Sequence, residues 1–143
     1  MNRVMVDSSV ILGWLLDDSV NQGEDVAFVR EVIHRGGDIL APGLMVMEVV
    51  NACYWRHHLT LEKIELIVQR LADLEINYIN SEELDISDLV YLIEAYQLTA
   101  YDAAYLQAAI HDNCQLITHD KALLKADTKV CMTPEKFLEK YGL

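Results

Sequence analysis

The chain has 143 residues, and its 11 lysines and arginines stand against 23 aspartates and glutamates, for a formal net charge of −12. This length fits a single domain over residues 1–143 with one core. A hydrophobic content of 52% excludes a disordered chain. No apolar run approaches the ~20 residues of a membrane span, and the early Asp7 argues against a secretory signal. The cysteines are odd in number and lack C-x-x-C spacing, so we expect a reduced, cytoplasmic protein without disulfides or a zinc ribbon.

The apolar pattern predicts short strands that alternate with helices along the whole chain. Residues able to cap helix starts precede several of the helices: Ser8 or Ser9, Thr60, Ser81 and Thr99. Gly36-Gly37 predicts a helix end, and Thr133-Pro134 predicts a helix start. In chain order we expect strands at 3–7, 39–41, 76–79, 115–117 and 129–132, and helices at 9–16, 24–34, 44–57, 61–74, 82–96, 99–112, 121–125 and 135–141.

This alternation predicts a three-layer α/β/α sandwich, in which a central parallel sheet is covered by helices on both faces. In open parallel sheets, ligand sites lie beyond the carboxyl ends of the strands. Asp7 directly follows the first expected strand, and Asp120 comes three residues after Ile117 at the end of the fourth. The sequence therefore places candidate chemistry at that edge of the sheet, although both aspartates can also cap the helices that follow them.

Two further acids stand out by their surroundings. Glu48 lies among apolar residues, where an unpaired carboxylate is costly to bury, although a solvent-facing position is the alternative. Asn51 follows one turn later on the same helical face, so the two side chains can address one point. Asp102 lies in the first turn of its helix, where it can form a capping box with Thr99, and that structural role does not exclude a role in a site.

Charge is unevenly distributed along the chain. Between Arg70 and Lys121 there are ten acids and no lysine or arginine. Such a stretch indicates a metal site, a basic partner or simply a solvated acidic face. Converging carboxylates are tolerated when a divalent cation neutralises them, and Mg²⁺ and Mn²⁺ prefer oxygen ligands. An ion held in this way can activate water for attack on a phosphodiester.

Four segments together resemble the PIN-domain ribonucleases, and most closely the VapC-type toxins of toxin–antitoxin pairs. They are VMVDSS at 4–9, PGLMVMEVVNA at 42–52, LTAYDAAYLQAA at 98–109 and LITHDKAL at 116–123. The resemblance implies an acidic catalytic quartet of Asp7, Glu48, Asp102 and Asp120. Of these, Asp7, Asp102 and Asp120 are expected to hold Mg²⁺ or Mn²⁺, while Ser9, Asn51 and Thr118 orient the carboxylates.

The same resemblance implies an endoribonuclease that acts on tRNA or rRNA, is inhibited by a cognate antitoxin and forms a homodimer. Residues 44–74 offer apolar helical surface for such a dimer, and the acidity of the chain suits a basic antitoxin segment. Few cations are available to hold RNA phosphates. The candidates are Arg3, Arg56, Lys63, Lys121 and Lys125, with His57, His58 and His119 as further hydrogen-bond donors.

Two hypotheses from other classes stay open. A catalytically silent PIN-like module would only bind a protein partner and would have no need of four mutually repelling carboxylates. A receiver-like domain would accept a phosphoryl group on an aspartate at a strand end. Such a domain needs an acidic pair after the first strand and a lysine after the last, and neither stands at residues 7–9 or 130–133.

Overall fold

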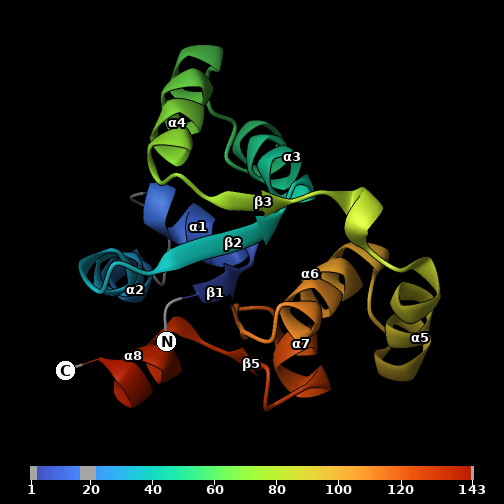
Figure 1. The fold of residues 1–143 in the computed structure, drawn as a ribbon. Coiled ribbons are helices and arrows are strands. Elements are labelled where there is room, and N and C mark those ends of the chain that lie inside the picture. The colour runs from blue at the N-terminus through green and yellow to red at the C-terminus, as the bar shows by residue number, and fades with distance from the viewer. Residues whose placement is uncertain (1–2, 17–21, 143) are drawn as a thin grey trace.

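The computed structural model describes residues 3–16 and 22–142. Its centre is a five-stranded sheet in the order β3-β2-β1-β4-β5, and every pair of neighbouring strands is parallel. The strands are β1 (Arg3–Val6), β2 (Asp38–Pro42), β3 (Asn77–Ile79), β4 (Gln115–Ile117) and β5 (Cys131–Met132). The predicted parallel sheet is therefore confirmed (Figure 1).

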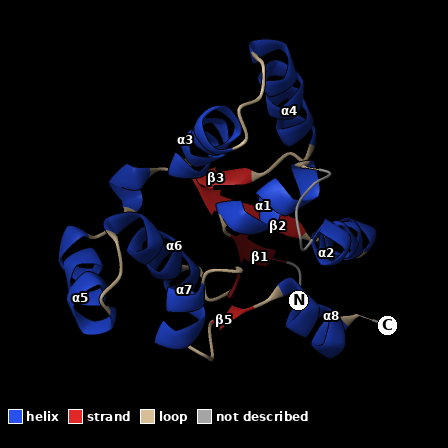
Figure 2. Ribbon diagram, turned by 180° about the vertical axis from the view of Figure 1, so that it is seen from behind, coloured by secondary structure: helices blue, strands red, loops and turns tan. Residues whose placement is uncertain are grey.

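Helices cover both faces of the sheet, as predicted. On one face α6 contacts β1, β2 and β4, α5 packs against α6, and α7 packs beside β5; α1, α2 and α8 lie on the other face (Figures 1 and 2). The helices are α1 (Ser8–Leu15), α2 (Gln22–His34), α3 (Leu44–Asn51), α4 (Leu61–Asp73), α5 (Ile86–Tyr96), α6 (Ala100–His111), α7 (Lys121–Ala126) and α8 (Pro134–Tyr141). Within residues 3–16 and 22–142, no helix is long and apolar enough to cross a membrane.

The core is densest around β1 and α6. Met5 and Val6 of β1 are fully buried because this strand is central and covered on both faces. Residues 103–109 of α6 are all buried, and four of them are alanines, whose small side chains let the helix lie close to the sheet. On the opposite face, the rings of Phe28 and Phe137 meet edge to face at 5.0 Å and join α2 to α8.

The structure decides between the two caps that the sequence offered for α1, and its cap for α5 differs from the prediction. Asp7, rather than Ser8 or Ser9, caps α1, because its extended backbone lets its carboxylate accept from the Ser9 N–H. Asp85, rather than Ser81, caps α5 by accepting from the Asp88 N–H at 3.1 Å. Residues 81–83 form a separate 3₁₀ turn before that helix. The predicted threonine caps at the starts of α4 and α6 are confirmed, and Thr133 caps α8 at the helix start predicted for Thr133-Pro134.

Two predicted elements are shorter than expected. The helix expected over 44–57 is α3 followed by a π-helical turn, η1 (Ala52–Arg56), which contacts α4. The strand expected over 129–132 is only β5, because the Asp127 carboxylate accepts from the N–H groups of Lys129 and Val130 at 3.0 Å and holds them in a turn.

The contact between Phe28 and Phe137 predicts that α8 is an integral part of the domain. Phe137 is 2% exposed, so Phe137→Ala should lower the free energy of unfolding by about 3–5 kcal/mol, measured by urea denaturation. The exposed neighbour Lys136 provides the control, because Lys136→Ala should stay within about 0.5 kcal/mol of wild type. Equal effects of the two substitutions would contradict the packing of α8 against α2.

Candidate active site

The candidate site lies where the connections of the sheet change direction. From β1 the chain passes to β2 on one side, and it later returns to β4 on the other side of β1. Ligand sites in parallel sheets form in the crevice outside the strand ends at such a point. A cleft of about 580 Å³ is present there, and all four predicted carboxylates line it, namely Asp7, Glu48, Asp102 and Asp120.

Asp7 is the most deeply placed of these carboxylates. Only 5% of the residue is exposed, and burial raises the pKa of its carboxyl group above the ordinary value. Hydrogen bonds oppose this effect: the hydroxyls of Thr118 and Ser9 both donate to Oδ2, and the Ser8 hydroxyl donates to Oδ1 at 3.2 Å. The position and orientation of Asp7 are thus fixed by its neighbours.

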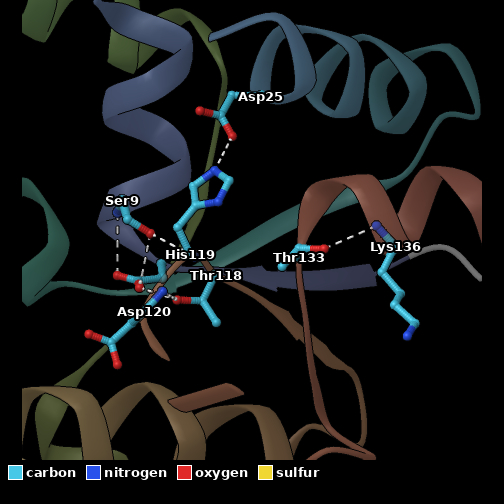
Figure 3. A network of polar contacts seen from close by, with 8 residues as sticks. Ser9, Asp25, Thr118, His119, Asp120, Thr133 and Lys136 are labelled. Atoms are coloured by element: carbon cyan, nitrogen blue, oxygen red, sulfur yellow. Dashed lines mark hydrogen bonds and ion pairs between the residues drawn. The ribbon is translucent and has the colours of Figure 1, made fainter. Parts of the chain in front are cut away.

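The loop after β4 connects Asp7 to Asp120. The Thr118 hydroxyl, which donates to Asp7, also accepts from the Asp120 N–H at 2.9 Å. Asp120 Oδ1 in turn accepts from the Leu123 N–H at 2.9 Å and caps α7. In Figure 3, Ser9, Thr118 and Asp120 gather at this end of the sheet. One hydroxyl group therefore sets the spacing between two of the acidic residues.

Glu48 is held by a residue that the sequence did not identify as part of the site. Tyr105 of α6 is 0% exposed, and its hydroxyl donates to Glu48 Oε1 at 2.6 Å. From its helical spacing Tyr105 is expected only to pack, but a buried tyrosine hydroxyl normally needs a hydrogen-bond partner. That requirement is the signal by which Tyr105 could have been identified as part of the site. Asn51 lines the cleft and is exposed, so it can contact a ligand, while Glu48 is oriented by Tyr105.

Asp102 shows that the carboxylates act on one another. Partial burial, followed by the negative charges of Asp120 and Asp7, raises the pKa of Asp102 to about 6. Burial also raises the pKa of Glu48; the hydrogen bond from Tyr105 lowers it, and the charges of Asp7 and Asp102 raise it further. The four groups therefore share one negative field at the cleft.

The donor set fits a hard divalent cation. Among the described residues, no three histidine, cysteine or acidic side chains lie close enough together to enclose an ion by themselves. Mg²⁺ does not require such an enclosure, because it usually retains several waters and binds through one or two carboxylates. The donors are all oxygens and face an open cleft, and neighbouring carboxylates help to raise the pKa values of Asp102 and Glu48, so the set is suited to this kind of ion.

The expected cations are divided between this cleft and other surfaces. Arg56 and His119 line the cleft, together with Trp55, which is 69% exposed. Arg3 begins β1 at the opposite edge of the sheet, where its guanidinium pairs with Asp112 at 3.5 Å. Arg3 is therefore not a cleft residue. Lys63 lies in a separate groove between α1 and α4.

The fold and the cleft define an α/β protein with an acidic site at the switch point of a parallel sheet. A sequence model of the PIN domain matches residues 4–129, so the chain belongs to the PIN domain family, whose members are generally metal-dependent nucleases. A solved structure, described as "Crystal Structure of PAE2754 from Pyrobaculum aerophilum", is similar with a TM-score of 0.71 and 19% identity, over 97% of this chain and 94% of that chain. This similarity supports the fold. A search of curated proteins gives no match to this sequence.

The raised pKa of Asp102 predicts how the stability of the metal-free protein depends on pH. The folded state binds this proton more tightly than the unfolded state, so the stabilisation that this group contributes is complete below its unfolded pKa of 3.8 and is lost as the pH rises through about 6. In EDTA, the melting temperature should therefore rise as the pH falls from ~7 to ~5. Solvent screening limits the contribution of Asp102 to roughly 2–4 °C.

The matched variants are Asp102→Asn and the exposed Asp88→Asn of α5. Asp102→Asn should raise the melting temperature at pH ~7 and flatten its dependence on pH, while Asp88→Asn should retain the wild-type dependence. Thermal unfolding followed by circular dichroism provides the measurement. An unchanged dependence in Asp102→Asn would show that the pKa of Asp102 is not raised in the folded protein.

Proposed function

We propose that this protein is a metal-dependent endoribonuclease, and the toxin of a type II toxin–antitoxin pair. The observation that carries the proposal is the arrangement of four carboxylates, supplied by separate segments of the chain, around one cleft at the switch point of a PIN-domain sheet. We further propose that it acts in the cytoplasm on structured RNA such as tRNA or rRNA.

Asp7, Asp102 and Asp120 are the proposed ligands of Mg²⁺ or Mn²⁺. When bound, the ion supplies the positive charge that activates water and stabilises negative charge on a phosphoryl oxygen. Asp7 is held ready for this role by the hydroxyls of Thr118 and Ser9. Asp102 and Asp120 make the electrostatic potential of the cleft more negative, and this potential attracts a cation.

Glu48 has a different proposed role. Tyr105 fixes its Oε1, which leaves Oε2 to orient the attacking water or to bind the ion. At the rim of the cleft, Arg56 supplies a charge for an RNA phosphate, and the exposed ring of Trp55 provides a surface on which an unpaired base can stack. The cleft thus offers contacts for both the backbone and a base of RNA.

Two protein partners belong to the proposal. Exposed apolar side chains on α3 and α4, among them Met47, Leu61 and Leu66, support a homodimer contact. The stretch over 71–120, with ten acids and no lysine or arginine, supports an antitoxin that carries a basic segment. Neutralising or covering the acidic cleft would give such an antitoxin a direct route to inhibition.

Cleavage of a mixture of tRNA and rRNA tests the proposed activity. The wild-type protein should give discrete fragments with Mn²⁺ or Mg²⁺ and none with EDTA. Asp7→Asn should lower the rate by more than ~100-fold, because even residues that only support metal ligands contribute 10–100-fold. The variant should remain folded, since asparagine also caps a helix well. Asp88→Asn, the same change at an exposed site in α5, should cleave like wild type.

The same experiment separates nuclease from silent binding module. Full activity in Asp7→Asn would exclude the proposed mechanism. If the folded wild-type protein cleaved no RNA and bound no Mn²⁺ in calorimetry, the silent module would replace the nuclease as the best description. Fragments formed equally in EDTA would instead indicate a contaminating ribonuclease.

The hydrogen bond from Tyr105 predicts a second, smaller effect. Tyr105→Phe keeps the ring in the core but frees Glu48, so kcat should fall by about 10-fold, with KM for RNA little changed. Tyr101→Phe, on the same helix but exposed, is the matched control and should retain wild-type kcat. A wild-type kcat in Tyr105→Phe would mean that Glu48 needs no fixed orientation.

A further inference from the structure

A hydrogen-bonded pair, Asp25 and His119, lies beside the cleft, and its buried member Asp25 has no role in the site described above. Asp25 of α2 is 0% exposed, and its Oδ1 lies 2.6 Å from Nε2 of His119. Its other oxygen, Oδ2, has no hydrogen-bond partner among the described residues. A carboxylate buried in this way is unfavourable unless its partner compensates for the lost hydration.

The neighbouring helix is shaped to admit this carboxylate. Gly13 of α1 is buried opposite Asp25, and a Cβ atom built on Gly13 would overlap the Asp25 carboxylate. Glycine inside a helix stabilises the helix less than alanine does, so Gly13 is a second unfavourable residue at the same place. An apolar side chain at position 25 with alanine at position 13 would serve packing alone better. The two residues together indicate that the carboxylate itself is needed.

His119 connects this pair to the acidic cleft. It lies between Thr118 and Asp120, and its backbone N–H donates to the Ser9 hydroxyl at 3.1 Å. That hydroxyl donates to Asp7, so the backbone of His119 belongs to the chain of hydrogen bonds that fixes Asp7. Figure 3 shows the His119 side chain extending away from Asp120 toward Asp25. The imidazole therefore anchors the loop over 118–120 to α2.

We propose that Asp25 is a positioning residue for the acidic cleft: through its hydrogen bond to His119 it fixes the loop over 118–120, and thereby the places of Asp120 and Ser9 relative to Asp7. The role rests on the proposed function for its effect on metal binding and cleavage. Its direct structural effect, the order of the loop, does not depend on that function.

The first comparison uses Asp25→Ala, which removes the anchor, and Asp25→Asn, which retains an oxygen able to accept from His119. Each variant is assayed below its melting temperature for Mn²⁺ affinity by calorimetry and for RNA cleavage. Asp25→Ala should raise the Kd for Mn²⁺ and lower kcat by about 10-fold each, with KM nearly unchanged, as for residues that support metal ligands indirectly. Asp25→Asn should recover most of both losses.

The second comparison reaches the same anchor from α1. Gly13→Ala should displace the Asp25 carboxylate and reproduce the Asp25→Ala defect, whereas Gly23→Ala in α2, where a Cβ meets nothing within 4 Å, should match wild type. In the Asp25→Ala background, Gly13→Ala should add no further loss, because the group that it would strike is gone.

Amide hydrogen exchange at His119 and Asp120 completes the test without metal or RNA. Both N–H groups are hydrogen-bonded in the anchored loop, so their exchange should be about 10-fold faster in Asp25→Ala and in Gly13→Ala than in wild type. If the wild-type protein neither bound Mn²⁺ nor cleaved RNA, the proposed function would fail, and this exchange would still decide the role of Asp25.

The proposal is overturned if Asp25→Ala shows wild-type Mn²⁺ affinity, kcat and loop exchange, whatever its melting temperature. It is equally overturned if Asp25→Asn is as defective as Asp25→Ala in all three, since the hydrogen bond would then not be the reason. Should Asp25→Ala fail to fold, the same assays are used to compare Gly13→Ala with Gly23→Ala. Equal values for these two variants reject the proposal.

Discussion

Mutual repulsion among carboxylates is the constraint on which this structure depends. Four negative groups share one cleft, and Arg56 alone among the described residues that line it is a lysine or arginine able to offset them. The fold overcomes this with fixed donors: hydroxyls of Thr118 and Ser9 on Asp7, and the hydroxyl of Tyr105 on Glu48. A site built in this way is unfavourable by itself and becomes favourable when positive charge enters it. The same repulsion would account both for the proposed affinity for a cation and for the unfavourable energy of the site without one.

The features predicted correctly from the sequence are those with local causes. Threonine caps depend on a backbone donor three residues away, so Thr60, Thr99 and Thr133 could be identified from their neighbours. Parallel strands follow from alternating apolar segments, and the acidic positions follow from the strand ends. Where two local capping residues competed, at Asp7 and Ser8 or Ser9, the sequence pattern could not decide between them.

The features that escaped prediction are contacts across the fold. The hydrogen bond between Tyr105 and Glu48 joins residues 57 positions apart, and that between His119 and Asp25 joins residues 94 positions apart. Each residue has an ordinary local explanation: a tyrosine on a buried helix packs in the core, and an aspartate in the first turn of a helix is stabilised by the helix dipole. Their polar atoms find partners only once the sheet has brought the segments together.

Asp7 and Asp120 serve the backbone as well as the cleft, since each caps the helix that follows it. Asparagine caps a helix about as well as aspartate does. Replacing one carboxylate oxygen by an amide would thus leave the helices intact and even relieve the repulsion between the acids. For a chain of this kind, losing its chemistry while keeping its shape is a short evolutionary step, and folded but inert descendants should arise easily. Selection for stability alone would favour that step, so four intact acids are best explained by selection for the charge itself.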